Sequence, residues 1–308
     1  MGENVILEIK DVCKSFKNKK VLKGVSFSIE SGDIQAIMGP NGVGKTTLLR
    51  MITGLYEPDS GSINRAKVAS DENYCSVLFE FNGLYPTFTL RENLTYFQNV
   101  KRNTNLPLSD EALNILKKLQ IDNELDKRIR FFSKGMLRKV AVARAVIDNP
   151  RLLVLDEPFD GLDVESHSFL VKYLREWAKE GNRSIIISSH NVADIDRLCN
   201  KVVLLKDGTV LRNTTVDEMK RETYDGYILC IEERDKDKLE KCLKDLNLHY
   251  VNSEKNVYGI EVAENDIIKM LSYLKENDII VVEGRKRVRD LEEIYLNHYE
   301  VRANEKYD

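Results

Sequence analysis

The chain has 308 residues, more than one hydrophobic core usually supports, so we expect a main domain and a smaller second one. Its composition, 42% hydrophobic and 31% charged, is that of a globular protein, and a net charge of −3 gives no reason to expect nucleic acid as a partner. The longest apolar runs are strand-sized and far short of the ~20 residues that cross a bilayer, which excludes a membrane-spanning segment.

Residues 5 to about 210 alternate short β-rich runs with helical periods, which predicts a layered α/β domain around a largely parallel sheet. Two early runs, residues 5–9 and 25–29, alternate apolar with polar side chains. This alternation is typical of antiparallel strands with one exposed face, so we expect the domain to begin with them.

The strongest motif is a glycine-rich loop between a predicted strand, residues 33–38, and a predicted helix, residues 45–54. The loop reads Gly39-Pro40-Asn41-Gly42-Val43-Gly44-Lys45-Thr46, and Thr47 follows it. Such P-loops turn backbone N–H groups around phosphate oxygens, and the helix N-terminus favours negative charge. We therefore predict that these residues bind a nucleotide, with Lys45 on the β- and γ-phosphates and the Thr46 hydroxyl on Mg²⁺. The alternative is a glycine-rich turn without function.

A second apolar run, residues 152–155, ends in the carboxylates Asp156 and Glu157. In phosphoryl transfer one carboxylate can hold the metal while another acts on the attacking water. We predict the first role for Asp156 and the second for Glu157. A strand that ends in Asp-Glu is common by itself, so this prediction depends on the P-loop.

A turn at residues 206–208 precedes a charged helix and linker, residues 216–222, beyond which the composition changes. We expect one domain over residues 1–215 and an accessory domain over residues 216–308. The predicted order in the second domain is strand, helix, two strands, helix and strand, over residues 227–232, 235–246, 249–262, 265–275 and 279–283. This is the split βαβ arrangement of α+β ferredoxin-like domains. A last helix is expected from Asp290, with one apolar face for packing.

One further motif distinguishes this sequence among the many classes of P-loop protein. The run Phe132-Ser133-Lys134-Gly135-Met136 resembles the signature loop of ABC ATPases, whose usual form is Leu-Ser-Gly-Gly-Gln. Together with the P-loop and the acidic strand, it makes residues 1–215 similar to the ATP-binding subunit of ABC transporters. The resemblance implies a P-loop ABC ATPase fold with a parallel core sheet, an antiparallel β subdomain and a helical subdomain. It also implies hydrolysis of ATP with Mg²⁺.

The resemblance implies roles for further residues. Ser133 and Gly135 keep the positions that touch the γ-phosphate in trans, so a second ATPase subunit, in a homodimer, is expected. Phe16 stands where the family stacks an aromatic ring on adenine, and Asp160-Gly161-Leu162-Asp163 resembles the D-loop. His190 resembles the H-loop histidine that contacts the γ-phosphate and holds the water. A single histidine after a strand is otherwise more often structural.

One position departs from the family pattern. Glu80 stands where the family has a lid glutamine that contacts Mg²⁺ and the water. A hard cation tolerates a carboxylate, but a third acid beside Asp156 and Glu157 should raise at least one carboxyl pKa when metal is absent. The exchange resembles the lantibiotic self-protection exporters, and drift or a related drug exporter would explain it equally well.

The region of residues 84–94 lies where the family receives a coupling helix from its permease. Exposed Tyr85 and Phe88 would suit such a partner, although both rings could instead fill a local core. The resemblance therefore implies an integral membrane permease subunit as a separate chain. It would hold the ATPase peripherally at the cytoplasmic side of the cell membrane. The cysteines, odd in number and without a Cys-x-x-Cys pair, fit a reducing cytosol.

We expect an ABC exporter of drugs or antimicrobial peptides, because the Ser-Lys-Gly-Met variant and the accessory domain resemble the drug and bacteriocin (lantibiotic) resistance branch. An importer ATPase is one alternative. A soluble ABC ATPase without a permease, serving translation or repair, is another, disfavoured by the single cassette and the absence of a long heptad arm. A module that binds ATP without hydrolysing it is disfavoured by Asp156, Glu157 and His190. The accessory domain could regulate, dimerise or stabilise the protein.

Overall fold

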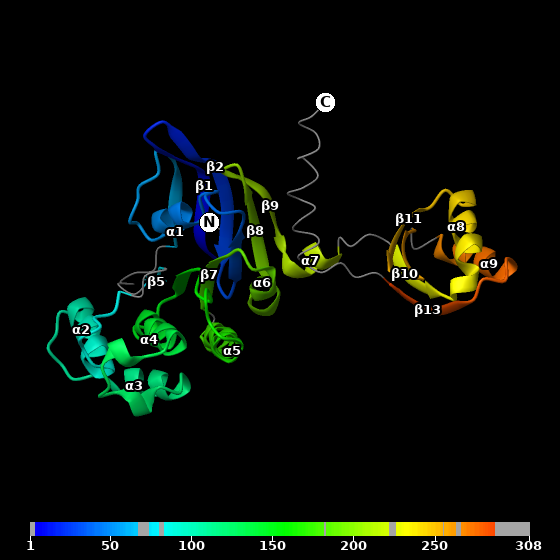
Figure 1. Cartoon of the computed structure of the whole chain (residues 1–308). Coiled ribbons are helices and arrows are strands. Elements are labelled where there is room, and N and C mark those ends of the chain that lie inside the picture. Colours follow the sequence, from blue (N-terminus) through cyan, green and yellow to red (C-terminus); the bar gives the residue numbers. More distant parts are fainter. Residues whose placement is uncertain are drawn as a thin grey trace. The chain divides into compact units, whose positions relative to one another are not determined.

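The computed structural model describes residues 4–66, 74–79, 83–181, 183–221, 226–254, 256–262 and 266–286. The chain divides into two compact units, Met1–Val216 and Asp217–Asp308 (Figure 1). This division falls next to the boundary expected between residues 215 and 216. In the described part of the chain, no helix is both long and apolar enough to cross a membrane.

An antiparallel sheet begins the N-terminal unit, with the strand order β2-β1-β4. Its strands are β1 (Val5–Phe16), β2 (Lys19–Glu30) and β4 (Ser60–Arg65). Along β2, Val25, Phe27 and Ile29 are buried and alternate with exposed serines. This is the period of two that the sequence showed, and the predicted antiparallel β subdomain is confirmed.

The core sheet has the strand order β5-β6-β7-β3-β8-β9. Its strands are β3 (Ile34–Met38), β5 (Cys75–Leu78), β6 (Leu152–Asp156), β7 (Ser184–Ser189), β8 (Lys201–Lys206) and β9 (Thr209–Thr215). All neighbours are parallel except β8 and β9. Strands β3, β6 and β7 are buried along their whole length, which explains their continuous apolar sequences. The carboxyl ends of these strands lie at one edge of the sheet. The P-loop, Glu157 and His190 follow β3, β6 and β7 at that edge.

Strand β9 was missing from the sequence prediction. It forms a hairpin with β8 through Asp207 and Gly208, whose φ angles are 50° and 82°. Two successive positive φ angles are typical of the tight hairpin turns that Asp-Gly favours. The Asp-Gly turn is visible in the sequence, but Thr209–Thr215 has two adjacent apolar residues, Val210 and Leu211, and no strict alternation that would predict a strand.

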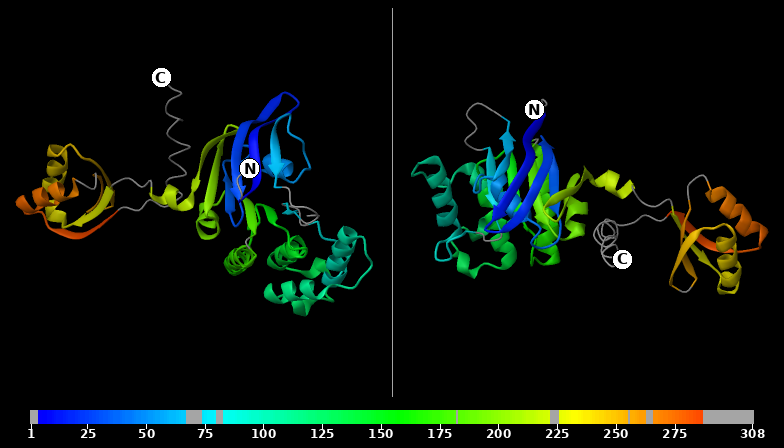
Figure 2. Two further views of the ribbon diagram at one scale, coloured as in Figure 1. Left: turned by 180° about the vertical axis from the view of Figure 1, so that it is seen from behind. Right: turned by 90° about the horizontal axis from the view of Figure 1, so that it is seen from above.

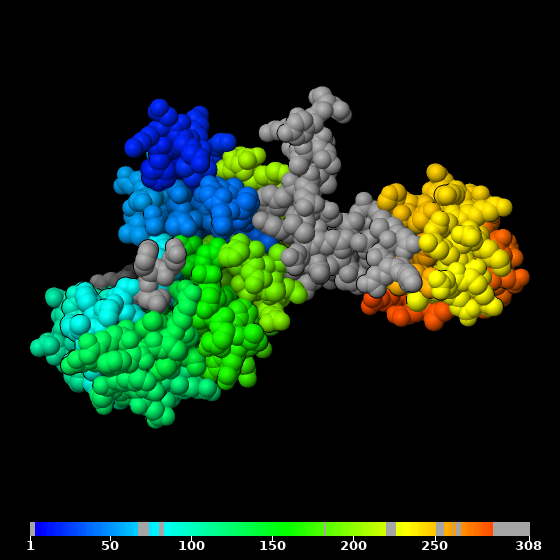
Figure 3. Space-filling view, in the orientation of Figure 1, coloured from blue at the N-terminus to red at the C-terminus, as the bar shows by residue number. Residues whose placement is uncertain are grey.

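The helices of the N-terminal unit are α1 (Lys45–Ile52), α2 (Leu90–Arg102), α3 (Asp110–Lys118), α4 (Lys134–Val146), α5 (Val164–Glu180) and α6 (Val192–Leu198). Helix α7 (Val216–Arg221) begins at the last residue of this unit and continues into the second unit. Helices α2, α3 and α4 stay together in every view and form the predicted helical subdomain (Figure 2). In the space-filling view the blue strands β1 and β2 and the cyan-to-green helical subdomain lie at opposite ends of the unit (Figure 3). Short 3₁₀ turns are η1 (Asp122–Glu124), η2 (Ile129–Phe131) and, in the second unit, η3 (Glu233–Asp235).

The C-terminal unit has the predicted split βαβ order. Its elements are β10 (Gly226–Ile231), α8 (Lys236–Asp245), β11 (His249–Glu254), β12 (Val257–Glu261), α9 (Ile267–Glu276) and β13 (Val281–Lys286). The strands are antiparallel in the order β11-β12-β10-β13, and both helices cover one face. Residues Leu229, Tyr258, Leu243 and Leu274 belong to the core between the sheet and the helices. The helix expected from Asp290 lies outside the described residues.

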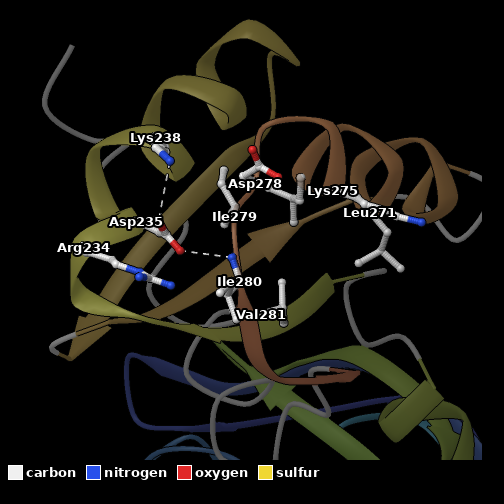
Figure 4. A pocket seen from close by; sticks show the side chains of 10 residues that line it. Arg234, Asp235, Lys238, Leu271, Lys275, Asp278, Ile279, Ile280 and Val281 are labelled. Atoms are coloured by element: carbon white, nitrogen blue, oxygen red, sulfur yellow. Dashed lines mark hydrogen bonds and ion pairs between the residues drawn. The ribbon is translucent and has the colours of Figure 1, made fainter.

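A buried acid at the N-terminus of α8 binds the backbone just before β13. Asp235, only 3% exposed, accepts a hydrogen bond from the Ile280 N–H at 3.1 Å and pairs with Lys238 Nζ at 3.9 Å (Figure 4). It borders a hollow of about 640 Å³ whose floor includes buried Leu274 and Ile279. The Asp235 carboxylate therefore already has two partners within the C-terminal unit.

We expect Asp235→Ala to lower the free energy of unfolding by about 1–3 kcal/mol, because it leaves the Ile280 amide without its acceptor. Urea unfolding followed by circular dichroism measures the loss, and hydrogen exchange at the Ile280 amide locates it. Glu233→Ala removes an exposed acid nearby and should change stability by no more than ~0.5 kcal/mol. Equal effects of the two substitutions would contradict this role of Asp235.

Candidate functional site

The P-loop joins β3 to α1, and at two of its glycines there is no room for a side chain. A Cβ at Gly39 would lie 2.6 Å from the Leu205 carbonyl oxygen, and one at Gly44 would lie 2.6 Å from Leu22 Cδ2. Gly44 also has a φ of 113°, a left-handed conformation that favours glycine. It is the N-cap of α1 and makes no side-chain capping bond, so the first amides of the helix face the loop. This arrangement suits phosphate oxygens.

Lys45 is held inside the loop. Its side chain is 7% exposed, and Nζ donates to the Gly39 carbonyl oxygen at 2.7 Å. Glu157 Oε1 lies 3.9 Å from the same nitrogen. Burial lowers the pKa of Lys45, and the carboxylates of Glu157 and Asp156 partly oppose this shift. The ammonium is therefore poorly hydrated and close to the place where the loop can hold phosphate.

Asp156 and Thr46 meet at the end of β6. Thr46 Oγ1 donates to Asp156 Oδ1 at 3.3 Å, and Ser188 Oγ donates to the same oxygen at 2.5 Å. The contact with Ser188 exists because β6 and β7 pair with Asp156 opposite Ser188. A hydroxyl and a buried carboxylate at one point are ligands of the kind that Mg²⁺ takes in nucleotide sites. The residues predicted to hold the metal thus fit it, while Glu80 lies outside the described residues.

Glu157 and His190 form a pair across the ends of β6 and β7. His190 Nδ1 lies 3.0 Å from Glu157 Oε2, and the Glu157 amide donates to Ser188 Oγ at 3.0 Å. Glu157 has a φ of 45°, a strained conformation of the kind found at functional sites. Burial raises the pKa of Glu157, whereas His190 and Lys45 lower it less strongly. Burial is thus the main cause of the raised pKa of Glu157, and Asp156 adds a small contribution. The effect expected from Glu80 stays a prediction, because Glu80 lies outside the described residues.

Lys45, Thr46, Glu157 and His190 border a cleft of about 570 Å³. The residues that line it are Val21, Asn41, Gly42, Gly44, Lys45, Thr46, Thr47, Glu157, Asp160 and His190. Val21 was not predicted, and Asp160 was identified only as part of the D-loop. Of the described residues predicted for the P-loop and the metal, four are not among the lining residues, namely Gly39, Pro40, Val43 and Asp156. Pro40 is exposed, Val43 packs into the hydrophobic core, and Asp156 is buried beside the lining residue Thr46.

Phe16 stands at the end of β1 and is 40% exposed. Its ring meets Tyr56 edge to face, with centroids 5.6 Å apart. It is not among the described residues that line the cleft, although an exposed ring remains available for stacking. The contact with adenine therefore stays a prediction.

The signature loop is built as a helix cap. Ser133 is the N-cap of α4, and its Oγ accepts a hydrogen bond from the Met136 N–H at 3.2 Å. A side chain at Gly135 would collide with Ser166, and Lys134 lies over Gly161 of the D-loop. Among the described residues, neither Ser133 nor Gly135 lines the cleft that contains Lys45. The structure of one chain therefore does not bring the two halves of the predicted site together.

Comparisons with known proteins agree with this geometry. A sequence model of the ABC transporter family matches residues 22–160. The ABC transporter ATP-binding protein NatA of Bacillus subtilis is 32% identical over 225 residues, which cover 70% of this chain and 91% of NatA. The Nod factor export ATP-binding protein I of Bradyrhizobium diazoefficiens is 28% identical over 301 residues, 95% of this chain and 96% of that protein.

A solved structure of an ATP-binding subunit of an ABC transporter is similar to this one, with a TM-score of 0.61 and 29% identity. The aligned region covers 70% of this chain and 92% of the solved chain. The similarity confirms the predicted ABC ATPase fold. The chain therefore belongs to the ABC transporter family, as the subunit that binds and hydrolyses ATP.

Proposed function

We propose that this subunit uses ATP hydrolysis to drive a separate permease chain that exports drugs or antimicrobial peptides from the cytoplasmic side of the membrane. The observation that carries the proposal is the cleft itself. It brings Lys45, the Thr46 and Asp156 pair and the Glu157 and His190 pair to one edge of the core sheet.

Each of these residues has a role in the proposed reaction. The P-loop amides and Lys45 bind the β- and γ-phosphates. Thr46 and Asp156, together with Glu80, would hold Mg²⁺, and a bound Mg²⁺ would neutralise charge on the phosphates. Glu157 orients the attacking water and accepts its proton, and a raised pKa makes this carboxylate a better base. His190 holds the Glu157 carboxylate and contacts the γ-phosphate.

A second copy of the chain completes each site. Ser133 and Gly135 lie outside the cleft of their own chain, which supports their action on ATP held by the other subunit. To shift the ratio of closed to open dimer from 1:99 to 99:1, ATP must bind the closed dimer more tightly than the open one by ~5.5 kcal/mol. Two ATP molecules bound between the subunits would supply it, and hydrolysis would remove the bridging γ-phosphates and reopen the dimer.

The permease surface that we propose is an aromatic cluster, defined as Tyr85, Phe88, Tyr96 and Phe97. Tyr85 lies 5.2 Å from both Phe88 and Tyr96 between ring centroids. Tyr85, Phe88 and Tyr96 are nonetheless 42%, 37% and 41% exposed, more than rings that only fill a core. Phe88 and Tyr96 also border a groove of about 800 Å³ along α2, a shape that suits a helix of a partner.

Export is favoured over import by two observations. A relative that this chain matches over 95% of its length, and therefore through the C-terminal unit, is named as an export ATP-binding protein. The signature loop carries the Ser-Lys-Gly-Met variant, which resembles the drug and bacteriocin resistance exporters. The relative's own cargo, Nod factor, differs from the cargo proposed here, so the type of cargo rests on the signature variant and Glu80.

We expect Tyr96→Glu to abolish co-purification with an integral membrane protein from detergent-solubilised membranes, because it places a charge in the aromatic cluster. ATP hydrolysis by the isolated subunit should be retained. Leu55→Glu adds the same charge at another exposed apolar residue, 60% exposed, and should leave co-purification intact. If no membrane protein accompanies the unsubstituted chain, the transporter proposal fails and a soluble ABC ATPase is indicated. Accumulation of a labelled drug by inside-out vesicles then tests the direction.

A further inference from the structure

Three side chains that do not line the cleft are joined by hydrogen bonds. His167 on α5 donates from Nε2 to Asp194 Oδ1 on α6, with the two atoms 2.6 Å apart. The other carboxylate oxygen of Asp194 accepts from Ser189 Oγ at 3.1 Å. Asp194 and Ser189 are 4% and 2% exposed, and the His167 side chain is 17% exposed. We call His167, Asp194 and Ser189 the buried relay.

One end of the buried relay holds the backbone beside His190. Ser189 is the last residue of β7 and directly precedes His190. Its Oγ also accepts from the Asn191 N–H at 3.0 Å, and Asn191 caps α6 through the Ala193 amide. Hydrogen bonds of Ser189 and Asn191 therefore fix the backbone on both sides of His190.

This pinning matters because His190 has little packing of its own. Its side chain is 57% exposed, yet its Nδ1 meets Glu157 Oε2 at 3.0 Å. An exposed ring can keep that contact only if its backbone stays in place. A shift of about 1 Å at a reacting group can reduce a rate as much as 10²-fold.

The other end of the buried relay contacts Phe159, the residue directly before the D-loop. The His167 ring packs on Phe159, with centroids 4.9 Å apart, and Phe159 is 6% exposed. Phe159 lies between Glu157 and Asp160, which both line the cleft. A displacement of the D-loop would therefore reach Asp194 through the same imidazole.

We propose that His167 is a positioning residue for ATP hydrolysis, which holds the His190 and Glu157 pair through Asp194 and Ser189 and links that pair to the D-loop through Phe159. The proposal rests on the functions proposed above for Glu157 and His190. His167 itself touches no reacting atom. Its role is to make the loops after β6 and β7 move as one body.

The test compares two substitutions at His167 in the full chain. His167→Phe keeps an aromatic ring beside Phe159 but removes the donor to Asp194, and we expect kcat to fall about 10-fold. The Kd for ATP should stay within about twofold, because the P-loop is unchanged. His167→Gln restores an N–H donor and should recover at least half of the kcat. Lys172→Gln, an exposed change on the same helix, should leave kcat and Kd unaltered.

The outcomes separate this proposal from the one on which it rests. An unchanged kcat in His167→Phe, or a Gln variant no better than the Phe variant, overturns the positioning role. Parallel losses of kcat and ATP binding would also overturn it and indicate general destabilisation. If His167→Phe does not fold, Ser189→Ala breaks the relay at its other end and should lower kcat alone. Full turnover in Glu157→Gln would instead refute the function proposed for Glu157.

Discussion

Glu157→Gln is expected to slow ATP hydrolysis by about 10²–10⁴-fold, the usual range for the loss of a general base. Glutamine has nearly the same shape and can still accept the hydrogen bond that His190 makes at 3.0 Å. The substitution therefore removes the proton acceptor while it leaves the cleft in place. Removal of the negative charge 3.9 Å from Lys45 Nζ should leave ATP binding intact or make it tighter.

Phosphate release under single-turnover conditions, together with equilibrium binding of ATP, measures both effects. Glu176→Gln, the same change on the exposed surface of α5, should behave as the unsubstituted chain. Turnover within a few-fold of normal in Glu157→Gln would contradict the assignment of the base. Loss of ATP binding would contradict it as well, because the P-loop is not altered.

Site residues that belong to short contiguous motifs could be predicted from the sequence. A glycine is required where a Cβ would strike Leu205 or Leu22, and the lysine and threonine that follow must begin the helix. The carboxylates after β6 could be identified because a buried parallel strand is a continuous apolar run with a polar end. These signals lie within a few residues of each other along the chain.

The residues that support the site could not be predicted in this way, because they depend on which elements become neighbours. Ser188 reaches Asp156 only because β7 pairs with β6. His167 and Asp194 are single polar residues on two different helices, and nothing in their local sequence indicates that they meet. Val21 lines the cleft because the β subdomain folds over the P-loop. Only the tertiary structure carries this information.

The signature loop resembles that of a family, and the function that this resemblance implies would form between two chains. Ser133 caps α4 and Gly135 packs against Ser166, so both have a structural explanation within one subunit. No residue spacing within this chain could show that they serve the nucleotide of another. The trans site therefore stays a prediction, which crosslinking of Ser133→Cys to a P-loop cysteine in a second subunit can test.

Lys45→Met is expected to weaken ATP binding by about 10–150-fold, because it removes charged hydrogen bonds worth about 1.5–3 kcal/mol. The loss should come from binding and not from folding. Lys45 is 7% exposed, and burial lowers its pKa, so the protein holds this ammonium in an unfavourable environment. A methionine of similar length fills the same space without a charge. We therefore expect the stability without nucleotide to stay equal or to rise.

Thermal unfolding with and without ATP distinguishes the two effects. A ligand at 100 times its Kd stabilises the native state by about 2.7 kcal/mol, so the unsubstituted chain should gain that amount at such a concentration. At the same ATP concentration Lys45→Met should gain less than about 1.5 kcal/mol, because the ratio of ligand to Kd is at least tenfold smaller. Lys179→Met, an exposed residue of α5, should gain as much as the unsubstituted chain. An equal gain in Lys45→Met would show that the ammonium does not bind the phosphates.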